Sequence, residues 1–353
     1  IVLSGYPELN GKTLLEKRTD AQKHHDELRK ALIWEPRGHA DMYGAIIVEP
    51  DTTNADFGVI FIHNEGYSTG CGHAVIALTK VFVETGLIAM NEPETEVKMD
   101  VPSGFIKSYA EVNNGQVTGV RFENVSSFVQ SLDKEIDVLG FGKISYDLAF
   151  GGAYYAFVDV SQVGLDCTPE YETQLIETAM KIKHTIMDSV EMAHPIEQDM
   201  NFLYGVIFSC ASKDRNHHSR NVCIFAEGEV DRSPTGTGVS ARAAILHARG
   251  EIKVGESIII ESIIGSTFSV KVVTTTTFGN YDAVIPEVSG NAYNREECIL
   301  DQPERPIKKW ICSKMKIFGN INLIIIQTNK INRLRRTLQQ RSMVLFKERN
   351  DRA

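Results

Sequence analysis

A cysteine and a threonine occupy matching positions in two related stretches of this chain. Residues 57–88 align without a gap to residues 221–252, with eight identities. At the centre of the alignment, Gly70-Cys71-Gly72-His73 stands opposite Pro234-Thr235-Gly236-Thr237. A duplicated chain that presents a thiol in one half and a hydroxyl at the equivalent point of the other predicts two lobes that face one shared site.

Acid-base chemistry is what this pair of side chains favours. We expect each residue at the N-terminus of a helix, where the helix dipole and unpaired N–H groups stabilise a thiolate. A thiolate at Cys71 is a base at neutral pH, whereas the hydroxyl of Thr235 does not ionise there. Proton removal from both faces of a substrate is therefore not expected.

The neighbours of the pair are suited to binding a small charged molecule. Gly72 and Gly236 leave room for a ligand to approach the backbone, so the first N–H groups of two facing helices can hold one carboxylate. His73 can orient a substrate or transfer a proton. Asp231, four residues before Thr235, either binds a cationic amine or caps the turn.

Other interpretations of these residues stay open. Cys71 can be a small buried apolar side chain. Residues 233–238 can cradle a phosphate, although they lack the lysine of a P-loop. A metal site from Cys71, His73 and His63 would have a spacing that fits no usual zinc pattern, so we expect no metal. A Cys71–His73 dyad is disfavoured, because side chains two residues apart at a helix start point in different directions.

Regular elements must place these residues at one site. In each copy we expect a β-rich run, a polar turn and then a helix, at residues 72–85 and 236–249, with Gly86 and Gly250 ending the two helices. An amphipathic helix is predicted at residues 169–190. Alternating strands are predicted at residues 44–48, 96–100, 106–112, 117–122, 153–160, 257–261 and 267–273. Many strands around one apolar helix per half predict an α+β fold built twice.

Composition and charge limit the classes of function. The chain has 353 residues, 42% of them hydrophobic and 24% charged, which is typical of a globular protein of two domains. The first 300 residues carry 24 basic and 42 acidic side chains, so we expect no nucleic acid partner. The six cysteines form no CxxC pair, which predicts free thiols and a cytoplasmic location. The sequence predicts no membrane span.

The duplication also divides the chain. We predict an N-terminal lobe at residues 1–138, a C-terminal lobe at residues 139–292 and a basic tail at residues 293–353 that completes neither lobe. The tail from residue 301 onward holds 13 basic and four acidic side chains.

Four segments of the sequence resemble the proline racemase family: residues 35–42, 64–74, 151–156 and 231–238. The resemblance covers about residues 1–292. It implies two pseudo-symmetric lobes, each a curved, mostly antiparallel sheet around a central helix, with the active site between them. Family members begin with a His-Thr-Gly-Gly-Glu-Pro segment ahead of the strand that starts here at Ile1, so we expect the true start to lie upstream.

The Cys71/Thr235 pair resembles the trans-3-hydroxy-L-proline dehydratase branch of that family. The resemblance implies that Cys71 removes the Cα proton and that Thr235 hydrogen-bonds the substrate or a water. It implies dehydration to Δ1-pyrroline-2-carboxylate without PLP, metal or nucleotide, and it makes a homodimer plausible. The implied substrate-binding residues are Gly72, His73, Asp231, Gly236 and Thr237.

Two alternatives to the dehydratase remain after the resemblance is taken into account. One is a racemase or epimerase of proline or hydroxyproline. The other is a non-catalytic binding protein of the same fold. A hydrolase that uses Cys71 ranks last, because no third residue can be named to orient such a dyad.

Overall fold

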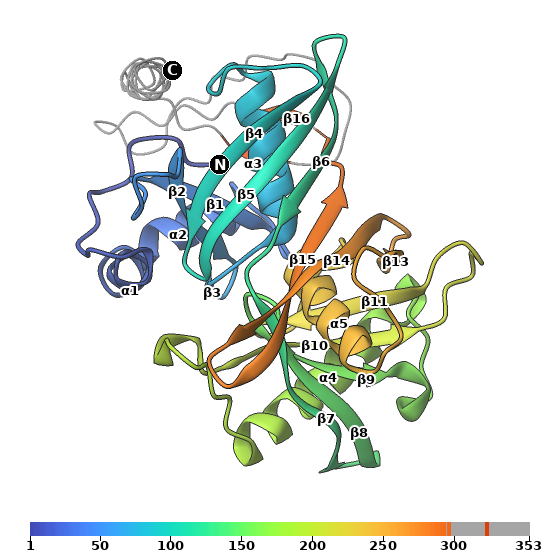
Figure 1. The fold of residues 1–353 in the computed structure, drawn as a ribbon. Helices are drawn as coiled ribbons and strands as arrows, with labels where there is room; N and C mark the ends of the chain where they lie inside the picture. Colours follow the sequence, from blue (N-terminus) through green and yellow to red (C-terminus); the bar gives the residue numbers. More distant parts are fainter. Residues whose placement is uncertain (294, 298–321, 325–353) are drawn as a thin grey trace.

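Two α+β lobes meet where helices α3 and α5 begin (Figure 1). The computed structural model describes residues 1–293, 295–297 and 322–324. Its α-helices are α1 (Leu14–His24), α2 (Asp26–Ile33), α3 (Gly72–Glu84), α4 (Glu172–Ser189) and α5 (Gly236–Ala248). Short 3-10 turns follow at η1 (Val160–Val163), η2 (Pro169–Tyr171) and η3 (Gln198–Met200).

In the described part of the chain, the N-terminal lobe contains six strands, and β15 joins it to the C-terminal lobe. They are β1 (Tyr43–Val48), β2 (Phe57–His63), β3 (Gly66–Ser68), β4 (Glu94–Val101), β5 (Gly104–Asn113), β6 (Gln116–Glu123) and β15 (Tyr281–Gly290). The other strands are β7 (Ser127–Val138), β8 (Gly142–Phe150), β9 (Tyr154–Asp159), β10 (Leu203–Cys210), β11 (Ser219–Phe225), β12 (Glu229–Val230), β13 (Ser257–Glu261), β14 (Thr267–Phe278), β16 (Arg295–Glu297) and β17 (Asn322–Ile324).

Strand pairing repeats between the two halves of the chain. The order β1-β2-β4-β5-β6 in the first half matches β10-β11-β13-β14-β15 in the second. In each half the first pair is antiparallel, and the second pair is the parallel one that the central helix connects. Val2 pairs parallel with Ile46 on β1, as β9 does with β10. The α+β fold of two pseudo-symmetric lobes predicted from the sequence is confirmed.

Strand β15 joins the lobes. Its end at residues 287–290 pairs with β6, while its start pairs with β7 and its length with β14. The β7–β15 pairing closes β7 to β11 and β13 to β15 into a barrel in the C-terminal lobe. Figure 1 shows β15 in orange running from the lower lobe up to β6.

The central helices are buried on almost every side. Ten of the 13 residues of α3 are buried, and so are ten of the 13 residues of α5. A helix that is apolar all round belongs inside a core. Helix α5 is rich in glycine, alanine and serine, so it fits within the closed barrel, whereas α3 carries Val75, Leu78 and Phe82 toward an open sheet.

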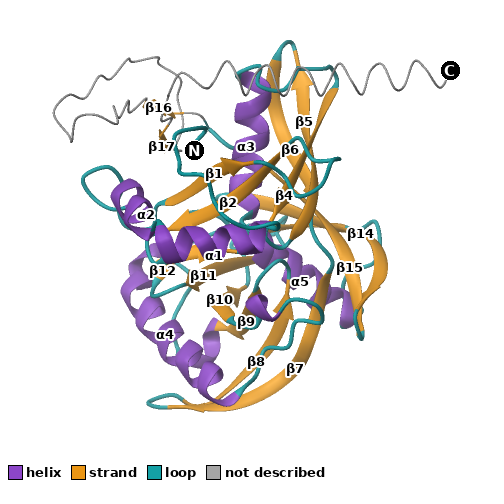
Figure 2. Ribbon diagram, turned by 90° about the vertical axis from the view of Figure 1, so that its left-hand side faces the viewer, coloured by secondary structure: helices purple, strands orange, loops and turns teal. Residues whose placement is uncertain are grey.

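Outer helices cover the sheets on the side away from α3 and α5. Helix α4 packs on β10 and β11, and α1 and α2 pack on β2 (Figure 2). The predicted helix at residues 169–190 is present as η2 and α4. The sequence analysis missed α1 and α2. Helix α1 buries few apolar side chains, and its start is fixed instead by a capping box between Thr13 and Glu16.

The division of the chain into domains stays a prediction. In the structure, β7 pairs with β8 and packs in the core of the C-terminal lobe, so we propose a boundary near residue 126 rather than 138. The predicted basic tail lies almost entirely outside the described residues. Among the described residues, no helix is long and apolar enough to cross a membrane.

Candidate active site

The two residues singled out at the centre of the repeat begin the two central helices. Cys71 is the N-cap of α3 and Thr235 is the N-cap of α5. Among the described residues, neither α3 nor α5 has a side-chain hydrogen bond that caps its first turn, and neither has an acidic residue in that turn. The first N–H groups of both helices therefore remain available to an anion, which the two helix dipoles also favour.

Backbone contact brings the two helix starts together. A Cβ atom on Gly72 would lie 2.5 Å from the Cα of Gly236, and the reverse distance is also 2.5 Å. Any side chain at either position would push the helices apart. Glycine is therefore required at both positions for the starts of α3 and α5 to share one pocket.

The backbone at Thr235 is unusual. Its φ is 68°, in a region that β-branched residues rarely adopt. Such a conformation costs about 1–3 kcal/mol and persists where the surroundings hold it. Here the holding contacts are a hydrogen bond from the Thr235 N–H to Ser233 Oγ (3.1 Å) and one from Thr235 Oγ1 to Asp231 Oδ2 (3.0 Å).

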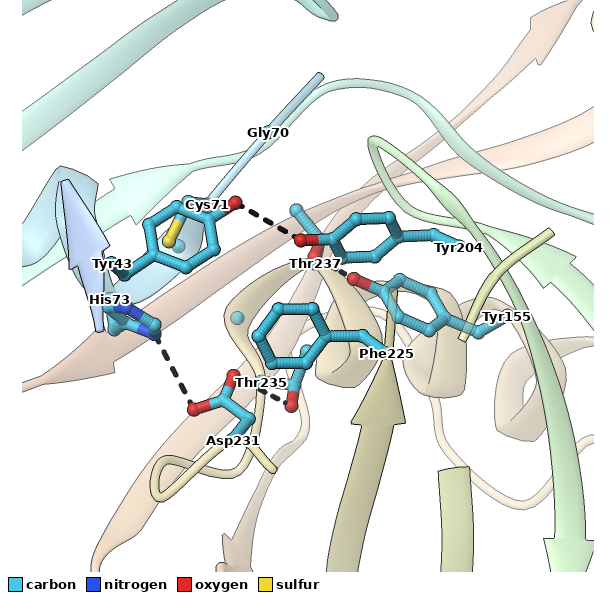
Figure 3. Close-up of a pocket in the computed structure, with 12 residues that line it drawn as sticks. Tyr43, Gly70, Cys71, His73, Tyr155, Tyr204, Phe225, Asp231, Thr235 and Thr237 are labelled. Atoms are coloured by element: carbon cyan, nitrogen blue, oxygen red, sulfur yellow. Dashed lines mark hydrogen bonds and ion pairs between the residues drawn. The ribbon is translucent and has the colours of Figure 1, made fainter. Parts of the chain in front are cut away.

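His73 and Asp231 form a charged pair across the two lobes (Figure 3). The His73 Nδ1 to Asp231 Oδ1 distance is 3.6 Å, and Ser233 Oγ lies 3.3 Å from the same nitrogen. The Ser233 N–H donates to Asp231 Oδ1 at 2.8 Å. Asp231 therefore receives donors from two sides while it faces the imidazole of the other lobe.

Charges in the pocket keep this pair ionised. Burial by itself would lower the pKa of His73, but the Cys71 thiolate and the Asp231 carboxylate raise that pKa well above its usual value. Burial would raise the pKa of Asp231, but the charge of His73 and the hydrogen bonds from His73 and Ser233 hold it below its usual value. His73 and Asp231 therefore each favour the charged form of the other.

Aromatic side chains form the other wall of the pocket. Tyr43 on β1 and Tyr204 on β10 place their hydroxyl oxygens 3.2 Å apart, and Tyr155 OH lies 2.7 Å from Thr237 Oγ1. Phe225 stacks on Tyr204 with a ring-centroid distance of 5.3 Å. In Figure 3 the tyrosine hydroxyl groups lie above Asp231, and Phe225 lies between them and Thr235. This aromatic wall offers neutral hydroxyl groups, and it adjoins the charged wall where the rings of Tyr43 and His73 meet edge to face at 5.3 Å.

All seven residues predicted for the site line this one pocket. They are Cys71, Gly72, His73, Asp231, Thr235, Gly236 and Thr237. Together with the aromatic side chains they enclose one small pocket. The chemical roles of these residues stay predictions.

The aromatic wall was not predicted from the sequence. The echo between residues 42–46 and 203–207 was visible in the sequence, and it contains both Tyr43 and Tyr204. That echo was a signal for two tyrosines at equivalent positions. Tyr155 lies in a segment that carried the family resemblance, yet no role had been assigned to it.

Two other histidines, His63 and His39, lie outside the residues that line the pocket. His63 pairs with Glu229 across the lobes, with a His63 Nδ1 to Glu229 Oε2 distance of 2.9 Å. His39 is turned toward the carbonyl of Ala40. In the described part of the chain, no three His, Cys, Asp or Glu side chains are grouped as metal ligands.

Fold and pocket together define a two-lobed α+β protein with a small-molecule site between helix N-termini. The family model described as proline racemase matches residues 1–308, and the chain belongs to the proline racemase family.

Two named proteins and one solved structure are similar to this chain over most of its length. It is 51% identical over 293 residues to a protein of Colwellia psychrerythraea named trans-3-hydroxy-L-proline dehydratase, covering 83% of this chain and 82% of the relative. It is 43% identical to a Burkholderia multivorans protein named 3-hydroxyproline 2-epimerase, with 83% and 88% covered. A crystal structure of a hydroxyproline epimerase from Agrobacterium vitis with bound trans-4-hydroxy-L-proline superposes with a TM-score of 0.77 at 35% identity, covering 82% and 85%.

Proposed function

We propose that this protein is a hydro-lyase that dehydrates trans-3-hydroxy-L-proline to Δ1-pyrroline-2-carboxylate. The observation that carries the proposal is the pairing of Cys71 and Thr235 at two helix starts that contact each other through Gly72 and Gly236. One side of the pocket then has a base, and the other has an alcohol that does not ionise near neutral pH.

The charged groups of the pocket suit an imino acid. Uncapped N–H groups at the starts of α3 and α5 receive the substrate carboxylate, at Gly72 and His73 from one lobe and at Gly236 and Thr237 from the other. Asp231 receives the protonated ring nitrogen. His73 holds Asp231 in place from the opposite lobe at 3.6 Å.

Dehydration follows from proton removal on one face. Cys71 takes the Cα hydrogen as a proton, and negative charge develops toward the carboxylate. The N–H groups at the helix starts stabilise this charge more in the transition state than in the ground state. The C3–O bond then breaks, water leaves and the resulting enamine tautomerises to the cyclic imine.

Thr235 explains why dehydration is preferred over racemisation. A two-base racemase needs an acid on the face opposite Cys71, and the hydroxyl of Thr235 is already a donor to Asp231 at 3.0 Å. We assign Thr235 the task of holding Asp231 and hydrogen-bonding the substrate or a water.

Incubation of the full chain with trans-3-hydroxy-L-proline tests the proposal. We expect pyrroline-2-carboxylate to form, and Cys71→Ser to reduce its formation by 10³-fold or more, on the order of the losses seen when a catalytic base is removed. Cys210→Ser, in the half-buried thiol at the end of β10, is the matched control and is expected to keep wild-type activity. Product formation unaffected by Cys71→Ser, or a D-enantiomer accumulating from L-proline, contradicts the assignment.

We also propose that the protein acts in the cytoplasm and as a homodimer, as the sequence analysis predicts. Size-exclusion chromatography with light scattering measures the oligomeric state. Fractionation of cells that express the full-length protein measures its location.

A further inference from the structure

The proposed dehydration requires a proton donor for the departing hydroxyl group. Hydroxide is a poor leaving group, so the C3–O bond breaks readily when a proton reaches the oxygen at the same time. The inference below rests on the proposed function and concerns which side chains supply that proton.

Stereochemistry locates the leaving group relative to Cys71. In a trans-3-hydroxy imino acid the C3 hydroxyl lies on the ring face opposite the carboxylate, and the Cα hydrogen also points away from the carboxylate. The hydroxyl group and the Cα hydrogen therefore share one face. Because Cys71 takes the Cα hydrogen, the donor to the leaving oxygen must lie on the Cys71 side of the ring, and Thr235 is on the wrong side.

The two walls of the pocket indicate which way C3 points within the plane of the substrate ring. In the substrate, the ring nitrogen and C3 flank Cα on opposite sides. The nitrogen belongs with Asp231, beside His73 and Ser233. His73 Nδ1 is turned into this charged wall. C3 then faces the aromatic wall, where the tyrosine hydroxyl groups are (Figure 3).

We propose that the hydroxyl pair of Tyr43 and Tyr204 is the subsite for the leaving hydroxyl group and relays a proton to it. The two oxygens are 3.2 Å apart, one from each lobe at equivalent positions of the duplicated chain. Both residues line the pocket together with Cys71. The Tyr43 hydroxyl also contacts Ser68 Oγ, in the same lobe as Cys71. The Tyr155 hydroxyl is bonded instead to Thr237, on the Thr235 side.

Electrostatics agrees with this geometry. Burial raises the pKa of Tyr43 well above its usual value, and the neighbouring Cys71 thiolate raises it further. Burial also raises the pKa of Tyr204 well above its usual value, and Tyr43 and Cys71 raise it further. Both hydroxyl groups therefore keep their protons and can act as donors.

The relay balances without any added reagent. The Cα–H bond breaks first and reversibly, its proton binds Cys71 Sγ, and its electron pair is shared between Cα and the carboxylate. That electron pair then forms the C2=C3 double bond as the C3–O bond breaks. Tyr204 gives its proton to the departing oxygen, which leaves as water. Tyr43 passes a proton to Tyr204 and regains one from the Cys71 thiol, so that the thiolate is restored.

Removal of the hydroxyl groups separates this role from a structural one. We expect Tyr43→Phe and Tyr204→Phe each to slow formation of pyrroline-2-carboxylate by about 100-fold or more. Exchange of the Cα hydrogen of the same substrate for deuterium in D2O should stay within a few fold of wild type, because Cys71 is intact. NMR measures both rates in one sample.

Tyr154→Phe is the matched control. Tyr154 is a buried tyrosine next in sequence to Tyr155, its hydroxyl has no hydrogen-bond partner in the described structure, and it packs in the core of the C-terminal lobe. Both of its rates should equal those of wild type. A loss of exchange together with elimination in Tyr43→Phe and Tyr204→Phe, or no loss of elimination, overturns the relay.

A substrate with a better leaving group gives a second measurement. Fluoride departs without a proton, so trans-3-fluoro-L-proline should be converted by Tyr43→Phe and Tyr204→Phe at rates close to wild type. Fluoride release that is slowed as much as water release overturns the proposal. A wild-type chain that forms no pyrroline-2-carboxylate contradicts the proposed function and the relay, whereas wild-type rates in the variants contradict the relay alone.

Discussion

At the level of single residues, the pocket depends on the acidic groups that surround one imidazole. The Asp231 carboxylate lies 3.6 Å from His73 Nδ1, and together with the Cys71 thiolate it outweighs the effect of burial on the pKa of His73. A histidine whose pKa is raised in the folded protein stabilises the fold fully below its unfolded pKa of about 6.5. That contribution is lost as the pH rises through the raised pKa.

Asp231→Asn removes one of the two negative charges. We expect the pKa of His73 to fall, and the free energy of unfolding to depend less on pH above about pH 6.5. NMR titration of the His73 ring protons measures the first effect, and urea unfolding at several pH values measures the second. Glu135→Gln, in an exposed pair with Lys143, should leave the His73 titration unchanged. An unaltered His73 midpoint in Asp231→Asn would show that Asp231 does not act on this imidazole.

At the level of elements, the site depends on how closely two helices approach. The starts of helices α3 and α5 are in contact through Gly72 and Gly236. A Cβ atom added to either glycine would lie 2.5 Å from the Cα atom of the other. The contact lies between backbones, so no side-chain movement can relieve an added methyl group. The short distance between the two helix starts, and so between Cys71 and Thr235, therefore requires glycine at both contact positions.

Gly236→Ala tests this contact. We expect it to lower the free energy of unfolding by about 1–3 kcal/mol, as overpacking does, and to abolish turnover by separating the helix starts. Gly66→Ala is the control, because its added Cβ atom would meet its nearest neighbour, His63, at an ordinary 3.9 Å. Thermal or urea unfolding and the dehydration assay check both variants. Equal stability and activity in the two variants would contradict a tight helix contact.

At the level of the whole molecule, two kinds of contact hold the lobes together. One is the pairing of β6 with β15, and the other is a set of buried polar contacts between the lobes. His63 and Glu229 come from opposite lobes and are almost completely buried, with 4% and 7% of their side chains exposed. Asp41 accepts a hydrogen bond from the Val230 N–H at 2.9 Å. His63 also stacks on Tyr43, with ring centroids 5.7 Å apart, so this contact supports the aromatic wall of the pocket.

Glu229→Ala leaves His63 buried without its carboxylate partner. We expect a loss of about 1–3 kcal/mol in the free energy of unfolding, because a buried polar group of His63 loses its nearest polar partner. Glu135→Ala breaks an exposed pair in which 70% and 60% of the side chains are accessible, and it should cost less than about 1 kcal/mol. Urea unfolding compares the two, and similar losses would argue against an interlobe role for His63 and Glu229.

Local patterns were enough to predict the repeated core of this protein. The helices starting at Gly72 and Gly236 follow from apolar periodicity closed by glycine, and their observed starts agree. Helices α1 and α2 escaped prediction because their positions depend on packing against β2 and on a cap rather than on a strong apolar stripe. The long pairing of β7 with β8 was not predicted, because β7 buries few side chains toward its end.

The sequence by itself determined which groups can do chemistry: a thiol and an alcohol at equivalent helix starts, with His73 and Asp231 close in sequence to them. Tertiary structure alone decided which groups meet. Tyr43 and Tyr204 are 161 residues apart, yet their hydroxyl groups are 3.2 Å apart because two lobes close on one pocket. Side-chain periodicity reports what is buried within an element, whereas the distance between two elements depends on all the packing that separates them.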